Sequence, residues 1–170
     1  MGYSERAVVD LGLVEQHANY LLALGGVVKP PVSSNLISVF DTASRILVVV
    51  KPIAPLRGVV QRDPRGWSIV IDKGLPRGAK RFTLFHEGFH ILLELGTIQI
   101  PGPEQYLEWL ADAFAARVLM PRRWLVESVK KAGDINQLCA TYQVSHRAIN
   151  RRLKELDLCL SPWSTSERVL

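Results

Sequence analysis

The segment RFTLFHEGFHILLEL, residues 81–95, constrains the rest of the chain more strongly than any other. It contains two histidines, His86 and His90, at positions i and i+4. On a helix these positions lie on one face, so both imidazoles can reach a single divalent metal ion. Glu87 lies at the edge of that face, where its carboxylate can reach a metal-bound water. This His-Glu-x-x-His pattern is typical of zinc-dependent peptidases, in which the bound cation lowers the pKa of its water to about 7.

The same pattern can arise by chance in a helix with two polar faces. The flanking sequence argues against chance, because apolar side chains surround the motif and predict a buried helix. These side chains are Phe82, Leu84, Phe85, Phe89, Ile91, Leu92 and Leu93. Unpaired polar groups in a buried helix cost roughly 1–3 kcal/mol each, and one metal ion would satisfy both histidines and the glutamate. The sequence therefore predicts a metal site.

Length and composition predict one domain with a substantial core and at most a small appendage. The chain has 170 residues, of which 48% are hydrophobic and 22% are charged. These values are ordinary for a soluble globular protein. The net charge of +5 and the pI of about 9.5 permit nucleic acid or acidic partners without demonstrating either.

Cysteine usage and the N-terminus indicate where the protein works. Cys139 and Cys159 fall in segments that read as helix or helix end, so no disulfide framework is expected. The N-terminus lacks the basic and apolar regions of a signal peptide. The longest aliphatic run, residues 46–50, is far too short to span a bilayer. We therefore expect a cytoplasmic protein with no membrane partner.

Hydrophobic periodicity and turn residues predict an α+β fold. Three strands are expected at residues 46–50, 56–62 and 67–72, with a hairpin turn at residues 63–66. Helices are expected at residues 4–24, 35–44, 81–95, 104–119, 122–131, 135–142 and 146–156. Ser33 or Ser34 should cap the second of them. A small twisted, largely antiparallel sheet should then pack on the metal helix.

The expected domain organisation follows from these elements. A zinc metallopeptidase domain is predicted over residues 1–121, up to the break at Met120-Pro121. A helix-turn-helix-like helical bundle is predicted over residues 122–160. Residues 161–170 are polar and are expected to form a flexible tail.

Catalytic zinc takes three protein ligands, so a third ligand must come from elsewhere in the chain. A histidine six positions after His90 would mark the metzincins, but position 96 is glycine, which excludes that class. Glu94 shares the metal helix but points wrongly, because two helical turns separate it from His86. Glu108, in the middle of the next long helix, is the best candidate.

The surroundings of Glu108 support this choice. Ala111 and Ala115 are small enough to let this helix approach the metal helix closely. Asp112, one turn beyond Glu108, can accept the second ring N–H of a ligating histidine. Considered alone, Glu108 and Asp112 would be assigned to the solvent-exposed face of an amphipathic helix. Opposite a His-Glu-x-x-His helix, their spacing favours the metal site.

RFTLFHEGFHILLEL followed by ExxADAFAARVLMP resembles the ImmA/IrrE family of bacterial and phage metallopeptidases. The hairpin before the metal helix and INQLCATYQVSHRAINRRLKEL after it resemble the same family, so the likeness covers nearly the whole chain. The resemblance implies a gluzincin-like site in which His86, His90 and Glu108 bind Zn²⁺, with Mn²⁺ as the alternative in vivo. Glu87 would be the general base. The implied substrate is a helix-turn-helix repressor, whose cleavage induces a stress or mobile-element response.

One departure from the family pattern concerns the two residues between Glu87 and His90. The family usually has glycine directly before the second histidine, whereas here Gly88 and Phe89 are exchanged. A bulky phenylalanine at this position can alter the packing beneath the metal.

The C-terminal helices loosely match a helix-turn-helix pattern. Arg147, Arg151 and Arg152 decorate the last helix and could contact phosphates and guanine edges. The alternative is a solvated basic face on a bundle that supports the peptidase core. No cluster of aromatic, Asn or Gln side chains accompanies the arginines, so we expect weak attraction to nucleic acid or contact with an acidic partner.

The sequence leaves three classes of function open. The first is a peptidase in which Glu87 activates water and a substrate strand pairs with the sheet edge near residues 67–72. Tyr106 and Tyr142 are candidates for stabilising the oxyanion. The second is a DNA-binding or repressor-binding regulator with a structural or vestigial metal site. The third is a metal-dependent scaffold that holds a repressor without cutting it.

Overall fold

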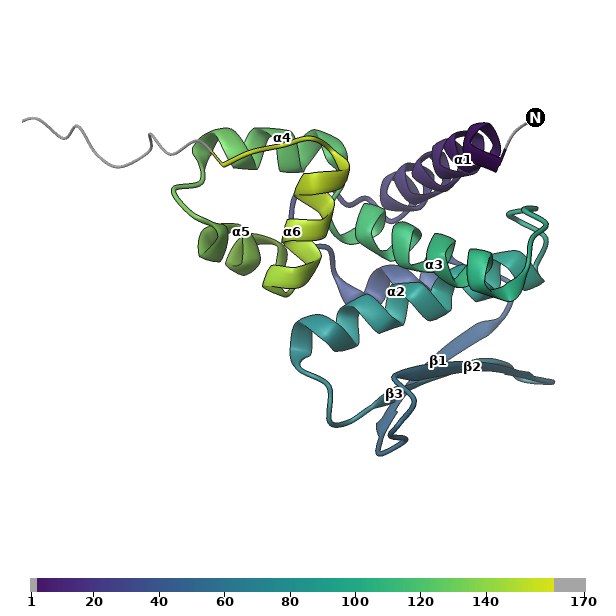
Figure 1. Ribbon diagram of the computed structural model, residues 1–170. Coiled ribbons are helices and arrows are strands. Elements are labelled where there is room, and N and C mark those ends of the chain that lie inside the picture. The colour runs from purple at the N-terminus through teal and green to yellow at the C-terminus, as the bar shows by residue number, and fades with distance from the viewer. Residues whose placement is uncertain (1–2, 161–170) are drawn as a thin grey trace, which may run out of the picture.

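Helix α2 (Arg77–Glu94) lies between a small sheet and helix α3 (Glu104–Leu119) in a computed structural model that describes residues 3–160 (Figure 1). The other elements are α1 (Tyr3–Leu24), η1 (Ser34–Val39), β1 (Arg45–Lys51), β2 (Gly58–Asp63), β3 (Gly66–Asp72), α4 (Arg122–Lys131), α5 (Ile135–Tyr142) and α6 (His146–Glu155). Helix α1 packs on α3, and α4, α5 and α6 gather at one end of the α2–α3 pair. The predicted α+β class is confirmed.

The three strands form a mixed sheet with β3 in the middle, in the order β1-β3-β2. Strands β2 and β3 are antiparallel, as the hairpin predicted, whereas β1 runs parallel to β3. The prediction that a substrate would pair near residues 67–72 is therefore wrong, because β3 is paired along both sides. The edge that remains open beside α2 belongs to β2.

Helix α2 is buried because apolar side chains occupy most of its circumference. Phe85 and Phe89 are both 0% exposed, and the Phe89 ring packs on Phe114 of α3 with centroids 5.4 Å apart. Each such burial contributes about 1.5–3 kcal/mol. Gly88 leaves room for Phe40, because a Cβ there would lie 2.7 Å from the Cε2 atom of that ring. The order Gly88-Phe89, which is the reverse of the usual family pattern, is therefore compatible with the fold. Phe89 packs in the core, and Gly88 leaves space for the residue that follows η1.

The helix expected at residues 35–44 is shorter than predicted, since η1 is a short 3₁₀ helix. Of the two predicted caps, Ser33 is the one that accepts a hydrogen bond from the Asn35 backbone N–H, at 3.2 Å. Asp41 ends the regular structure because its carboxylate accepts two backbone N–H groups just beyond it and the indole N–H of Trp67 at 2.9 Å. Hydrogen bonds from a side chain to the backbone compete with the backbone hydrogen bonds of a helix. The spacing of apolar residues, from which the longer helix was predicted, does not reveal this competition.

The turn between α5 and α6 docks on the beginning of α2. Gln143 adopts the left-handed conformation with φ 53°, at the turn position where glycine is common. Arg81 of α2 is 6% exposed and donates to the carbonyl oxygens of Tyr142 and Gln143, both at 3.3 Å. Gly78 permits the close approach, because a Cβ there would lie 3.2 Å from the Cα of Val144. These contacts fix the start of α6 beside α2.

Two buried arginines join α6 to α1 and α3. Arg152 of α6 is 0% exposed and Arg117 of α3 is 5% exposed. Arg117 Nε lies 3.0 Å from Glu15 of α1, and Arg152 Nη1 lies 3.0 Å from Glu155. Arg152 also donates to the carbonyl oxygen of Met120 at 3.3 Å. This position does not fit the nucleic-acid or partner contact predicted for Arg152, because a fully buried guanidinium cannot reach a phosphate or an approaching protein.

Two expectations concern the chain beyond these elements. The tail predicted at residues 161–170 lies outside the described residues. Within residues 3–160, no helix has both the length and the apolar content that a membrane span requires.

Glu155→Gln should destabilise the fold by about 2 kcal/mol at neutral pH, because it leaves two buried arginines with one carboxylate fewer. Burial alone would raise the pKa of Glu155, but Arg152 and Arg117 outweigh it and hold the pKa below its usual value. The charge therefore contributes stability above the ordinary glutamate pKa of about 4.3, and this contribution is lost as the pH falls below that value. Urea unfolding of the wild type and of Glu155→Gln, at pH values above and below this pKa, measures the difference in the free energy of unfolding.

The matched control is Glu127→Gln, which removes an exposed carboxylate whose ion pair within residues 3–160 is with exposed Lys130. It should change stability by less than about 0.5 kcal/mol. Equal stability of Glu155→Gln and the wild type at neutral pH would contradict the role given to the buried cluster.

Candidate metal centre

The two motif histidines lie on the face of α2 that meets α3. His86 and His90 are partly buried, with ring centroids 5.2 Å apart. Glu108 of α3 reaches both of them: one carboxylate oxygen lies 3.1 Å from His86 Nε2 and the other lies 3.2 Å from His90 Nε2. Ala111 and Ala115, on the same face of α3 as Glu108, are both 0% exposed. Their small side chains allow the close packing of α2 on α3 that the sequence predicted.

These three side chains fit one metal ion. One possible ligand atom from each lies within 4.8 Å of the others. Nitrogen and oxygen ligands about 2.0–2.2 Å from one tetrahedral ion are roughly 3.3 Å apart, close to the two separations above. Two imidazoles and a carboxylate also form the donor set of many catalytic zinc sites, which leave a further position open.

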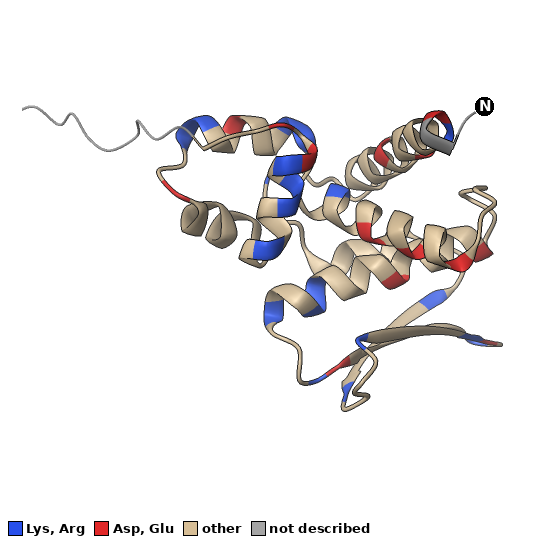
Figure 2. Ribbon diagram, viewed as in Figure 1, with Lys and Arg blue, Asp and Glu red and all other residues tan. Residues whose placement is uncertain are grey.

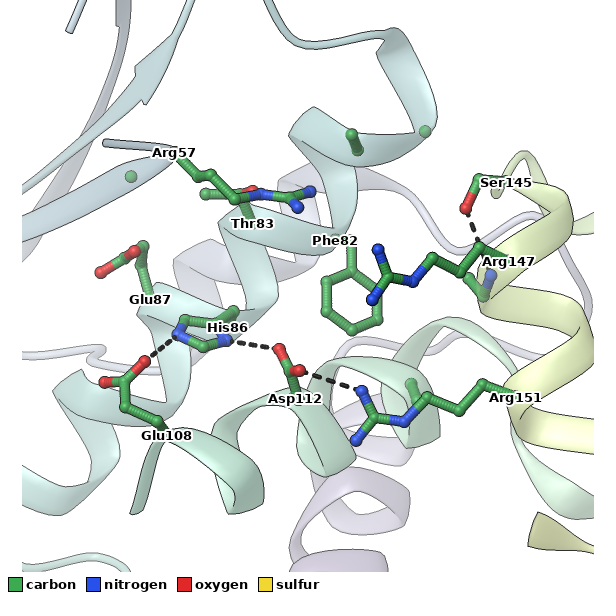
Figure 3. Close-up of a pocket in the computed structure, with 15 residues that line it drawn as sticks. Arg57, Phe82, Thr83, His86, Glu87, Glu108, Asp112, Ser145, Arg147 and Arg151 are labelled. Carbon is green, nitrogen blue, oxygen red and sulfur yellow. Dashed lines mark hydrogen bonds and ion pairs between the residues drawn. The ribbon is translucent and has the colours of Figure 1, made fainter. Parts of the chain in front are cut away.

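Asp112 supports the first histidine from one turn further along α3. Its Oδ1 lies 3.0 Å from His86 Nδ1, so an N–H on that nitrogen donates to the carboxylate and directs Nε2 towards Glu108. Its Oδ2 accepts a hydrogen bond from Arg151 of α6 at 3.0 Å. Burial alone would raise the pKa of Asp112, but the bonds from His86 and Arg151 outweigh it and hold the pKa below its usual value. Asp112 is therefore a fixed anion that links α6 to the candidate metal centre (Figure 3).

The electrostatics of the two histidines differ. Burial lowers the pKa of His90, and the nearby His86 lowers it further, which favours the neutral form that binds metals. For His86, burial again opposes protonation, but Asp112, Glu87 and Glu108 outweigh it and raise the pKa. Three carboxylates thus surround the two rings, and a cation in this position is electrostatically favoured.

Glu87 is placed differently from the candidate ligands. It is 8% exposed, and the backbone N–H of Val60 in β2 donates to its carboxylate. Burial raises the pKa of Glu87, with a further contribution from Glu108. Gly58 lets β2 approach this closely, because a Cβ there would lie 2.6 Å from Glu87 Oε1 and 2.4 Å from Thr83 Cγ2. A carboxylate with a raised pKa beside an open strand edge suits proton transfer.

The structure brings some predicted residues together and separates others. Arg147 and Arg151 line a cavity of about 400 Å³ that also contains His86, Glu87 and Glu108. The predictions for the two tyrosines are wrong. Tyr106 donates its hydroxyl to Asp10 at 2.7 Å, and Tyr142 is 0% exposed with its hydroxyl on Ser128 at 2.8 Å. Neither tyrosine lines the cavity.

Arg57 and Gly58 are among the cavity residues that were not predicted from the sequence. Gly58 stands inside a segment with strand character, and glycine at such a position marks a close approach of another group. That signal was available. Arg57 carried no signal, because nothing in the sequence shows that the segment before β2 lies across from α6.

Comparison with known proteins agrees with this geometry. The sequence profile of the IrrE N-terminal-like domain, a peptidase family, matches residues 42–154. Among solved structures, a Mycobacterium tuberculosis transcriptional regulator is similar in fold, with a TM-score of 0.62 and 13% sequence identity. The similarity covers 88% of this chain and 48% of that one, so the chain spans about half the length of the regulator. No curated protein matches the sequence.

Asp112→Ala should weaken binding of Zn²⁺ by about 10–100-fold, because His86 loses the acceptor that orients its ring. Competition with a chromophoric chelator measures the affinity. The control is Glu104→Ala, which removes an exposed carboxylate from the first turn of the same helix and should leave the affinity unchanged. Equal affinities of Asp112→Ala and the wild type would show that Asp112 does not support the metal centre.

Proposed function

The chain belongs to the family of IrrE N-terminal-like peptidase domains, and from this premise we propose that it is a metal-dependent endopeptidase that cleaves a helix-turn-helix repressor. The observation that carries the proposal is the convergence of His86, His90 and Glu108 from two helices, with the Glu87 carboxylate buried beside them. This family is one of metallopeptidases, which implies a metal, and Zn²⁺ is the ion that this donor set fits best. Mn²⁺ is the alternative in vivo.

The proposed roles of the side chains follow from their positions. His86, His90 and Glu108 would hold the ion, and Asp112 would keep the His86 ring in the orientation that ligation requires. When bound, Zn²⁺ supplies a Lewis acid that polarises the scissile carbonyl and activates water. The rest of the reaction depends on groups of the chain itself.

Glu87 is the proposed general base. Its carboxylate would take a proton from the attacking water and deliver it to the leaving nitrogen of the peptide. Burial and Glu108 raise the pKa of Glu87, which brings it nearer to neutral pH and so makes both transfers easier. The bond from Val60 N–H fixes the carboxylate against β2 and keeps it out of the ligand set.

Strand β2 is the proposed binding edge for the substrate. Asp72 N–H donates to the Arg57 carbonyl at 2.9 Å, which makes these two residues a hydrogen-bonded pair. Because such pairs alternate in antiparallel ladders, the peptide groups of Gly58, Val60 and Arg62 point away from β3. The Val60 N–H among them already binds Glu87, and the other groups face the open edge. An extended peptide could pair there and pass its backbone close to Glu87. This replaces the edge predicted from the sequence.

The repressor substrate and the cytoplasmic location come from the family resemblance and from the sequence. Cleavage of such a repressor would induce a stress or mobile-element response. The alternative, a DNA-binding regulator with a structural metal site, receives less support. Arg147 and Arg151 line the cavity that holds the candidate metal centre, and Arg152 is buried, so α6 offers few free arginines to a duplex.

Glu87→Gln should retain metal but lose about 10²–10⁴-fold in the rate of cleavage, because the amide cannot accept the proton. The assay incubates the protein and Zn²⁺ with the repressor encoded nearest to its gene, and follows the intact repressor by mass spectrometry. Glu94→Gln is the control on the same helix, since its side chain is 55% exposed. It should cleave at the wild-type rate.

Two results would contradict the proposal. Cleavage by Glu87→Gln at the wild-type rate would remove Glu87 from the mechanism. The wild-type protein could also bind a full equivalent of metal yet cleave neither this repressor nor a library of unstructured peptides. That result would favour a regulator or a scaffold.

A further inference from the structure

The cavity at the candidate metal centre extends well beyond it. Its volume is about 400 Å³. One end is formed by the histidines and carboxylates of α2 and α3. The other end is formed by Phe82 and Thr83 of α2, Arg57 before β2, and Arg147 and Arg151 of α6. Figure 3 shows Arg57 and Arg147 reaching into the cavity from opposite walls, with Phe82 between them.

The arginines of this second end are not equally free. Arg151 is held by Asp112 at 3.0 Å. Arg57 and Arg147 are both exposed, and among residues 3–160 neither side chain makes an ion pair or a hydrogen bond. The other acidic side chains of the cavity, Glu87 and Glu108, are engaged at the metal end. Two positive charges therefore face the cavity without a counterion from the described part of the chain.

The position of Arg147 is fixed by the fold. Arg147 and Arg151 are one turn apart on α6, so they share a face. The start of this helix is held on α2 by Gly78 and by the bonds from Arg81 to the preceding turn. Figure 2 shows the resulting separation of charge: Lys and Arg gather on α6 and at the beginning of α2, whereas Asp and Glu follow α3.

We propose that Arg57 and Arg147 form a specificity subsite that binds an acidic side chain of the peptide substrate, at a fixed distance from the bond that is cut. This inference rests on the proposed peptidase function and adds the substrate class. A guanidinium binds a carboxylate through charge-assisted, often bidentate, hydrogen bonds. The Phe82 ring between the two arginines offers an apolar surface to the methylene groups of a glutamate.

A peptide fits this cavity better than a nucleic acid does. The arginines share the cavity with Glu87, Glu108 and Asp112, whose carboxylates repel a phosphate backbone. A single acidic side chain on an extended peptide can reach the arginines while its backbone lies along β2. A duplex has a continuous row of phosphates and would have to bring several of them past the acidic end.

The first experiment uses a library of random, N-acetylated and C-amidated octapeptides, incubated with Zn²⁺-loaded protein, with cut sites read by mass spectrometry. The wild type should enrich Asp and Glu at one position relative to the cut. Arg57→Gln/Arg147→Gln should reduce that enrichment about tenfold, the loss expected for charge-assisted bonds. Arg147→Glu should shift the preference towards Lys and Arg, which a merely unstable variant would not do. Arg65→Gln/Lys154→Gln, with exposed residues outside the cavity, is the control.

The second experiment does not require cleavage. The side-chain Nε–H signals of Arg57 and Arg147 are followed by NMR during titration with N-acetyl-glutamate amide, with N-acetyl-glutamine amide as the neutral match. The acidic probe should move both signals at concentrations where the neutral probe does not, with or without Zn²⁺. Equal effects of the two probes would overturn the subsite even if peptides are cut. A preference seen here without any cleavage of the library would retain the subsite and reject the peptidase.

Two further outcomes would also overturn the inference. One is a wild-type library profile with no acidic preference. The other is a duplex DNA that binds at physiological salt, displaces the acidic probe and loses its affinity in Arg57→Gln/Arg147→Gln.

Discussion

The contact between α2 and α3 is the constraint on which the rest of the structure depends. Zn²⁺ binds nitrogen and oxygen ligands at about 2.0–2.2 Å, so two helices that share one ion must pack without bulky side chains between them. Here Ala111 and Ala115 provide the small surface on α3, while the Phe89–Phe114 contact fills the core beside it. This apolar packing fixes the distance between the two helix backbones. As a result, Glu108 of α3 lies within hydrogen-bond distance of His86 and His90 of α2.

Helix α6 is the second element tied to this interface. Arg152 anchors it in a buried charge cluster with α1 and α3, and Arg151 reaches Asp112 behind the first histidine. Arg147, which shares a face of α6 with Arg151, is left free to point into the cavity. One short helix therefore supports the fold, positions a group behind the candidate metal centre and lines the proposed substrate cavity. This explains why its arginines, which look alike in the sequence, have different surroundings.

Much of this could be predicted from the sequence, because local patterns carried it. The common face of His86 and His90 was visible from their spacing within an apolar segment, and the approach of Glu108 to them from the small residues that follow it. Contacts between distant segments were not visible. Nothing in the apolar strand at residues 46–50 shows that it pairs in parallel with β3, so the open edge was assigned to the wrong strand. Likewise, two of the partners of Arg152, Glu15 of α1 and the carbonyl oxygen of Met120 at the end of α3, are far away in the sequence.

The central claim is that one metal ion is bound jointly by α2 and α3. The most direct measurement is elemental analysis of the protein purified without chelator, compared with His90→Ala and Glu108→Ala. We expect about one equivalent of Zn²⁺ or Mn²⁺ in the wild type and a large loss in each variant, since a catalytic site of this class depends on three protein ligands. Circular dichroism would check that both variants remain folded. Full metal content in a folded Glu108→Ala protein would contradict the claim, because it would show that α3 does not contribute a ligand.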